Sequence, residues 1–310
     1  MNKTKKILDI VSAILAIVGF LYLFYKFSTD IDNIYQGLKT LSNSWWIIIT
    51  ELVLMLINIA LETLRWIEID KERSGRYSFY QNFKTITESI ALSLITPLGI
   101  GEHIGKARGS NNAKSSVVAS ALGSFIQTSV IVLMGIIGSL LLSYNDIILI
   151  AVVDIFIIVA ILILAIFVVY KAKTRLIIDI INEYSISKIA KIYLINIVRC
   201  IVFSYQMYLM QTLSISSFNT DIFYLILVYY MVITLTPSSG LADIGIRGTM
   251  AITFIGGTNN NWSGVAAVMI WIINKIIPSI FGFQSIIFSV IKSRRNHSDS
   301  GIANEPLGNL

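Results

Sequence analysis

The chain has 310 residues, of which 55% are hydrophobic and 14% are charged, and its mean hydropathy is +0.75. Soluble domains carry a charge on roughly a quarter of their residues, so this composition indicates an integral membrane protein without a soluble catalytic domain. The formal net charge of +6 is interpreted as a signal of membrane topology and not of nucleic-acid binding.

Cysteine and histidine are too few for the commonest covalent and metal sites. The single cysteine excludes an intramolecular disulfide, and the two histidines belong to no Cys/His cluster. No P-loop, dinucleotide fingerprint or nucleophile triad is present. We therefore expect no cofactor, no metal and no catalytic residues.

Apolar runs near the length of about 20 residues that crosses a bilayer recur along the chain. Those interpreted as full spans are 7–27, 45–69, 115–143, 147–170, 188–212 and 263–291. The first run follows three lysines but lacks an A-x-A-like cleavage site, which favours a retained anchor over a signal peptide. The polar tail at 293–310 is expected to be disordered.

Two further pairs of short helix candidates are each separated by a Thr-Pro break. The pairs are 79–96 with 101–110, and 221–236 with 243–256. Irregular backbone at membrane depth is tolerated only inside protein or beside a wet cavity, so Pro97 and Pro237 mark buried or water-lined breaks. If each pair is a re-entrant hairpin, most Lys and Arg residues collect on one face, which is then cytoplasmic and holds both termini.

The two breaks resemble each other in sequence. "TPLGIGEHIGK" (96–106) and "TPSSGLADIGIRG" (236–248) both open with Thr-Pro and place a carboxylate before a glycine and a basic residue. We therefore predict two repeats, about 45–143 and 188–291, with opposite orientations because an odd number of crossings separates them. Broken helices in inverted repeats are a transporter design.

The predicted fold class is thus an all-α polytopic membrane protein. It has about six full spans and two re-entrant hairpins in one transmembrane domain, residues 1–292, of the plasma (inner) membrane.

Charged residues interrupt two of the apolar spans. Glu51, Asn58, Glu62 and Arg65 form one stripe along the second span, and Arg199 lies in the span at 188–212. An ionised group in the bilayer costs about 3 kcal/mol or more, so these side chains should face the bundle interior. The pair at 62 and 65 either neutralises itself or serves a ligand, whereas Arg199 has no acidic neighbour one turn away. A further buried cation is expected where Lys275 follows an asparagine.

Three motifs together resemble the lysylphosphatidylglycerol synthase transmembrane region family of flippase-like proteins. They are "LRW" in the second span, "PLGIGE" before a basic residue, and "DIGIRG" in the second hairpin, and the resemblance covers roughly 10–292. The positions that match the family's motifs are Pro97, Gly101, Glu102, Asp243 and Arg247, while Gly99 stands where the family prefers an arginine. Some members carry a soluble aminoacyl-transfer domain, and we expect this chain to be the translocator without that enzyme.

The predicted function is a lipid translocator. It would move an anionic or aminoacylated phospholipid, or a lipid-linked headgroup, between leaflets. The expected substrate-binding residues are Arg65, Pro97, Gly101, Glu102, Lys106, Arg199, Pro237, Asp243 and Arg247.

Two other functions are compatible with the sequence. As a non-transporting partner of a glycosyltransferase or lipid-modifying enzyme, the chain would have no pocket near its motifs. The pairs Glu62/Arg65 and Lys84/Glu88 would then be closed internally. As an intramembrane enzyme it would use Glu102 and His103, but no second activated group is evident.

Overall fold

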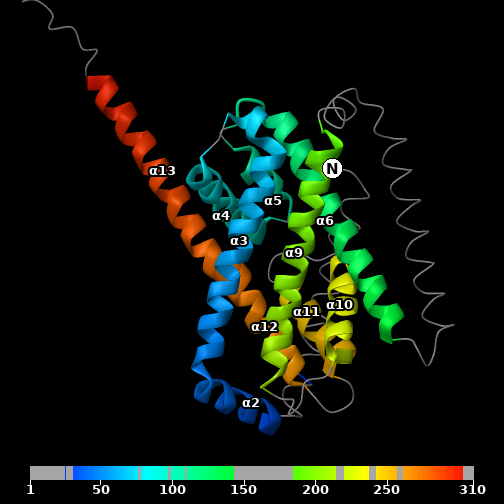
Figure 1. Cartoon of the computed structure of the whole chain (residues 1–310). Coiled ribbons are helices and arrows are strands. Elements are labelled where there is room, and N and C mark those ends of the chain that lie inside the picture. Colours follow the sequence, from blue (N-terminus) through cyan, green and yellow to red (C-terminus); the bar gives the residue numbers. More distant parts are fainter. Residues whose placement is uncertain are drawn as a thin grey trace, which may run out of the picture.

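The computed structural model describes residues 25, 31–75, 78–96, 99–108, 110–142, 184–213, 220–236, 242–256 and 261–302. This part of the chain is helical and contains no strand (Figure 1). The helices are α2 (Ile31–Asn43), α3 (Trp45–Ser74), α4 (Phe79–Ile95), α5 (Ile100–Ala107), α6 (Ala113–Leu142), α9 (Ile186–Gln211), α10 (Thr220–Leu235), α11 (Ala242–Ala251), α12 (Trp262–Trp271) and α13 (Ile277–Ile302). The π-helical segments η2 (Ile252–Gly256) and η3 (Ile272–Ile276) follow α11 and α12.

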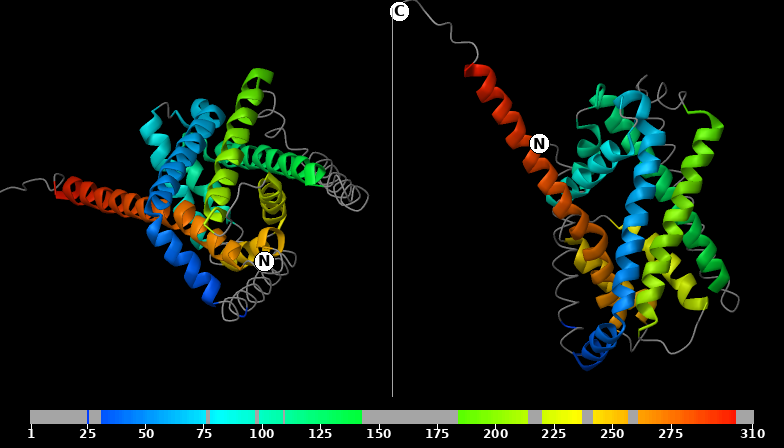
Figure 2. Two further views of the ribbon diagram at one scale, coloured as in Figure 1. Left: turned by 60° about the horizontal axis from the view of Figure 1, so that its bottom comes forward. Right: turned by 60° about the vertical axis from the view of Figure 1, so that its left-hand side comes forward.

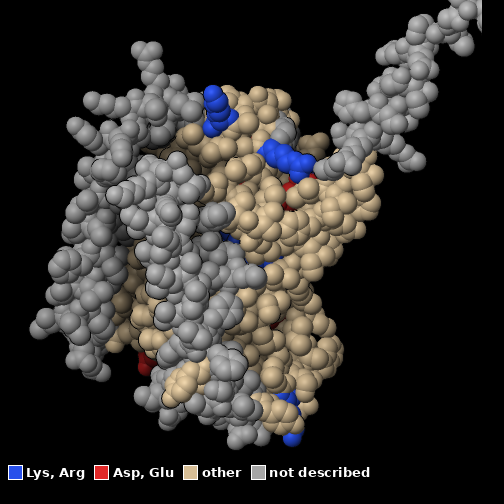
Figure 3. All heavy atoms as spheres, turned by 180° about the vertical axis from the view of Figure 1, so that it is seen from behind, with Lys and Arg blue, Asp and Glu red and all other residues tan. Residues whose placement is uncertain are grey.

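Three helical stretches in the described residues are long and apolar enough to cross a membrane. They are Trp45–Asp70, Ala113–Leu142 and Trp262–Ser289, and they coincide with three of the predicted spans. Few charged side chains of the described residues are visible on the face of the molecule that Figure 3 shows. The chain is therefore an all-helical membrane protein, as predicted.

The other predicted spans differ in how far the structure reaches them. The span at 188–212 corresponds to α9, which is 26 residues long and carries several buried polar side chains. The span at 147–170, and all but one residue of the span at 7–27, lie outside the described residues.

Near both ends of the described chain, the secondary structure differs from what the sequence predicts. The tail expected to be disordered from residue 293 instead continues α13 as far as Ile302. No proline or glycine lies between Gly282 and Gly301, so nothing in the sequence stops the helix earlier. Residues 31–43, for which the sequence predicts no helix, form α2, which lies across the lower end of α3 in Figure 1.

Helices α3 and α9 run side by side in opposite directions through the middle of the bundle (Figure 2). Three contacts fix this direction: Gln206 Nε2 to Glu51 O (3.3 Å), Arg199 Nε to Asn58 Oδ1 (3.1 Å) and Lys191 Nζ to Glu68 Oε1 (2.5 Å). Residue numbers rise along α3 as they fall along α9, so the helices are antiparallel.

Helices α4 and α5 fold back on each other through glycine. Gly99 has a φ of +66°, a left-handed conformation that glycine adopts without steric cost. A Cβ on Gly101 would overlap the backbone oxygen of Leu92, and one on Gly105 would stand 2.6 Å from Ser89 Cα. The two helices therefore pack with their backbones almost in contact.

The α4–α5 pair starts and finishes at one end of the bundle. The helix before it and the helix after it meet there, because Ser116 Oγ in α6 donates to Asp70 Oδ1 in α3 at 2.7 Å. The chain thus leaves α3 and returns to α6 at the same end.

The α10–α11 pair is arranged in the same way at the opposite end. Trp262 Nε1 in α12 donates to Met210 O in α9 at 2.8 Å, and Ser263 Oγ donates to Gln211 Oε1 at 3.0 Å. Figure 1 draws α4 and α5 in the upper half of the molecule and α10 and α11 in the lower half.

Each half of the bundle packs a helix on the short helices of the other half. Helix α6 lies against α10, where a Cβ on Gly138 would stand 2.9 Å from Leu227 Cβ. Helix α13 lies against α4, where Ser285 Oγ donates to Glu88 Oε1 at 2.6 Å. The two halves therefore interlock around the α3–α9 pair.

Candidate functional site

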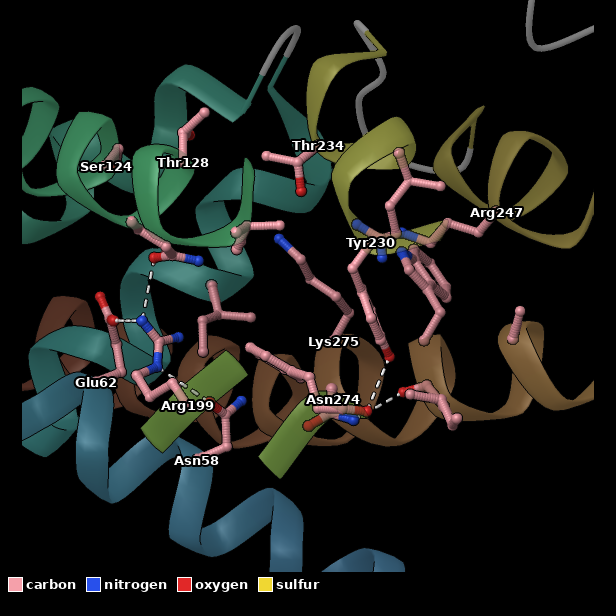
Figure 4. A pocket seen from close by; sticks show the side chains of 18 of the residues that line it. Asn58, Glu62, Ser124, Thr128, Arg199, Tyr230, Thr234, Arg247, Asn274 and Lys275 are labelled. Carbon is pink, nitrogen blue, oxygen red and sulfur yellow. Dashed lines mark hydrogen bonds and ion pairs between the residues drawn. The ribbon is translucent and has the colours of Figure 1, made fainter. Parts of the chain in front are cut away.

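A cavity of about 300 Å³ lies inside the bundle (Figure 4). The helices of both short pairs contribute to its wall, together with α3, α6, α9, α12 and η3. The charged side chains that line it are Glu62, Glu102, Arg199, Arg247 and Lys275. It is thus a polar space within an otherwise apolar bundle.

Glu62 is the centre of a buried ion cluster beside the cavity. Its Oε1 lies 2.6 Å from Arg65 Nη2 and 2.7 Å from Lys106 Nζ, and its Oε2 contacts Arg199. Lys106 also bonds Glu102 at 2.6 Å. This carboxylate therefore neutralises groups from α3, α5 and α9 at once.

Two cations of this cluster serve mainly to hold helices together. Arg65 Nη1 donates to the backbone oxygen of Gly123 in α6 at 2.9 Å. Lys106 Nζ sits 5.7 Å from the ring centroid of Trp66. Arg65 and Lys106 are both about 1% exposed and neither lines the cavity. They lie behind the wall that a ligand would touch.

Arg199 is the member of the cluster that faces the cavity. Its Nε bonds Asn58 Oδ1 and its Nη1 bonds Gln127 Oε1, both at 3.1 Å, in addition to its contact with Glu62. Figure 4 shows Asn58 and Glu62 of α3 beside the guanidinium, and Gln127 belongs to α6. The group is held in one orientation by neighbours from two other helices.

A second charged cluster lies across the cavity. Arg247 Nε bonds Asp243 Oδ2 at 2.7 Å, one turn away along α11, and Trp271 Nε1 donates to the same oxygen at 3.0 Å. Arg247 lines the cavity, whereas Asp243 does not. The carboxylate thus anchors the arginine to α12 without facing the cavity itself.

Lys275 differs from the other cations at the site. Its Nζ donates to Ser93 Oγ at 3.2 Å, and its charge also acts on Glu102, which lines the same cavity. It comes from the π-helical segment η3, a type of irregularity that is frequent at functional sites. Figure 4 shows its side chain reaching into the cavity between the two arginines.

The charges at the site do not balance. Among the described residues of the site, five basic side chains stand against three carboxylates, which leaves a formal excess of two positive charges. The basic ones are Arg65, Lys106, Arg199, Arg247 and Lys275, and the acidic ones are Glu62, Glu102 and Asp243. Ionised groups inside a membrane protein are costly unless they are paired, so the excess favours a site that receives an anion.

The predicted site residues are brought together, but in different roles. Glu102, Arg199 and Arg247 line the cavity, whereas Arg65, Lys106 and Asp243 lie behind its wall, where they pair with the charged groups that line it. Gly101 closes the α4–α5 contact, and Pro97 and Pro237 lie outside the described residues.

The neutral polar part of the cavity wall could not be predicted from the sequence. Gln127 and Thr128 lie in α6, a helix whose sequence reads as an ordinary span, so no local signal pointed to them. The sequence did mark Lys275 and Asn274 as a lone polar pair in an apolar stretch, but not as binding residues.

No family model matches the sequence, and no curated protein matches it either. The function must therefore be argued from the cavity and its charges.

Proposed function

We propose that the protein is a lipid translocator that carries an anionic phospholipid headgroup, or another phosphate-bearing lipid headgroup, across the membrane. The observation that supports this most directly is the positively charged cavity between the two pairs of short helices. A phosphate that enters it gains electrostatic attraction from Lys275, whose hydrogen bond is to the hydroxyl of Ser93. The predicted resemblance to the flippase-like family is consistent with the same role.

We also propose that the two halves form an inverted repeat, with six full spans and two re-entrant hairpins. The antiparallel direction of α3 and α9 supports this, as do the opposite ends at which the two short pairs start and finish. The reciprocal packing of α6 on α10 and of α13 on α4 is what a twofold relation between the halves would produce. Rocking of one half against the other would then expose the cavity to each leaflet in turn.

The proposed movement concerns the headgroup alone. The acyl chains stay in lipid, which is as apolar as the outer faces of the helices, while the cavity replaces water around the phosphate. Arg199 and Arg247 stand on opposite sides of the cavity, and both belong to the second half. Glu62 and Gln127 tie Arg199 to the first half, so a phosphate bound to Arg199 would also lie beside that half.

The direct test is a leaflet-accessibility assay in proteoliposomes. Phospholipids with a fluorescent acyl chain are reconstituted with the protein, and a membrane-impermeant reductant quenches the outer leaflet. We expect the quenched fraction to rise above that of protein-free liposomes, and Lys275→Met to slow the rise. Lys84→Met is the matched control, because Lys84 is nearly half exposed on α4 and does not line the cavity.

A non-transporting partner of a lipid-modifying enzyme is the second candidate. It is favoured by the closed Glu62–Arg65 pair, but it requires a pocket-free motif region, and the cavity lies there. The Lys84–Glu88 pair is also long, at 3.9 Å. If no phospholipid crosses the membrane faster than in protein-free liposomes, this candidate replaces the translocator.

A further inference from the structure

We infer that the cavity prefers a headgroup with two negative charges, as in a phosphate monoester, to a phosphate diester, which carries one. This narrows the substrate class of the proposed function, on which it rests. Three features of the site support it: its net charge, the positions of the cations that face the cavity, and the hydrogen-bond donors in the wall.

The described residues of the site carry a formal excess of two positive charges. The cluster around Glu62 contains three basic side chains and two carboxylates, and the second cluster contains one of each. Lys275 adds one further positive charge, which bonds the hydroxyl of Ser93 and also acts on Glu102. A headgroup with one negative charge would leave one positive charge uncompensated, whereas a headgroup with two would neutralise the site. Because uncompensated charge is costly inside a membrane protein, the doubly charged headgroup is favoured.

The carboxyl group of Glu51 does not change this count. Glu51 is fully buried, does not line the cavity and forms no ion pair within the described residues. A carboxylate without a cation is too costly to bury, so such a group is stable only in its uncharged form. The excess of two positive charges at the site therefore remains.

Three cations of the described residues face the cavity from three different elements. They are Arg199 of α9, Arg247 of α11 and Lys275 of η3. Figure 4 shows the lysine reaching into the cavity between the two arginines. The three terminal oxygens of a phosphate monoester point in three directions, whereas a diester has only two such oxygens. The spread of the cations around the cavity therefore suits the monoester.

The wall of the cavity also supplies neutral donors. Arg199 bonds the side-chain oxygens of Asn58 and Gln127, both at 3.1 Å. Since an arginine can only donate, each amide directs its oxygen to the guanidinium and keeps its NH2 group for another acceptor. Both amides line the cavity, as do the hydroxyls of Ser124, Thr128 and Thr234. A third terminal oxygen on the phosphate accepts more of these donors than a diester can.

The test compares two acyl-labelled lipids that differ only in the ester on the phosphate. Phosphatidic acid is a monoester with a charge of −2 above its second pKa of about 6. Phosphatidylmethanol is its methyl diester and carries a charge of −1 throughout. The labelled lipids are extracted from the outer leaflet of proteoliposomes with albumin at about pH 8.5 and at about pH 5.5, on either side of that pKa. The rate in protein-free liposomes is subtracted.

We expect phosphatidic acid to move about tenfold faster than phosphatidylmethanol at the higher pH, the effect of one further hydrogen bond to a charged group. At the lower pH both lipids carry one negative charge, so the two rates should converge.

Titration of the protein cannot imitate this result. The titratable groups around the site are Glu62, Glu102, His103, Lys106, Tyr229, Tyr230, Asp243 and Lys275, together with the arginines at 65, 199 and 247. A change of charge on any of them acts on both lipids, which place the same phosphate in the same cavity. It would therefore shift both rates in the same direction.

Three variants assign the preference to the charge of the site. Lys275→Met lowers the excess to one, so it should slow phosphatidic acid more than phosphatidylmethanol and remove most of the preference. Glu102→Gln raises the excess to three, so the preference should persist. Lys84→Met should leave both rates unchanged, because Lys84 is nearly half exposed on α4 and does not line the cavity. The comparison of the two lipids on the unaltered protein stands even if a variant fails to fold.

The outcomes separate this inference from the proposed function. Equal rates at the higher pH, or a preference that is undiminished at the lower pH, would overturn the inference and leave the translocator intact. The same holds if neither lipid moves but phosphatidylglycerol does. If none of the three lipids moves, the translocator and the inference fail together. Uptake of radiolabelled inorganic phosphate without lipid movement would show that the ligand is a free phosphate and would also overturn the inference.

Discussion

Removal of the carboxylate at Glu62 is expected to be the most damaging single charge change in the bundle. Glu62→Gln leaves the shape of the side chain but removes the charge that faces Arg65, Lys106 and Arg199. Lys106 keeps its bond to Glu102, whereas the two arginines keep only uncharged partners. Removing one partner of a buried ion pair lowers the free energy of unfolding by about 3–5 kcal/mol, because the remaining charge is left buried without compensation.

The measurement is Tm, the midpoint of thermal unfolding of the purified protein in detergent. It is observed as the loss of the monodisperse peak on heating. Glu68→Gln is the control, since Glu68 lies on the same helix but pairs with Lys191, whose side chain is 59% exposed. An exposed pair of this kind is worth about 0–1 kcal/mol. The control should therefore lower Tm by much less.

A double variant separates the charge effect from packing. In Glu62→Gln with Arg199→Gln, the second change removes a cation that the first change left uncompensated, so Tm should recover in part. If Glu62→Gln lowers Tm no more than Glu68→Gln, or if the second change only adds to the loss, then Glu62 is not the centre of the cluster.

The remaining expectations also concern stability in detergent. Gly282→Ala should lower Tm, because the new methyl would overlap the backbone of Thr87 and reduce the free energy of unfolding by about 1–3 kcal/mol. An unchanged Tm would show that α13 does not pack so closely on α4. Trp271→Phe should lower the free energy of unfolding by about 1–3 kcal/mol, because it removes the Nε1 donor from buried Asp243. A Tm equal to that of the unaltered protein would argue against this bond. Glu51→Gln should leave Tm nearly unchanged or raise it, because the fully buried carboxyl of Glu51 forms no ion pair within the described residues. A fall as large as that of Glu62→Gln would contradict this account.

Much of the helix pattern could be read from the sequence because it depends on short-range properties. Apolar runs predicted the stretches that form α3, α6 and α12–α13. The Thr-Pro and glycine breaks predicted where α4 and α10 end, and the observed ends at Ile95 and Leu235 agree within a residue. The failure at α13 has the same origin, because polarity alone does not end a helix that lacks proline and glycine.

Contacts between distant residues could not be read in this way. The sequence placed Glu62 beside Arg65 one turn away, and that pair is present, but Lys106 and Arg199 reach the same carboxylate from 44 and 137 positions along the chain. Lys275 lies 182 positions from its serine partner. Nothing in the local sequence distinguishes a cation that bonds a carboxylate from one that bonds a hydroxyl.

The composition, the apolar runs and the two matching breaks thus established an all-helical membrane protein with paired short helices and buried charges, because each depends on neighbours within one or two turns. The choice of which charges neutralise each other, and of which face the cavity, came from the packing of α5, α9 and η3 around α3 and α6. Coulomb attraction acts through space and not along the chain. The excess positive charge at Lys275 therefore appears only when the helices are assembled.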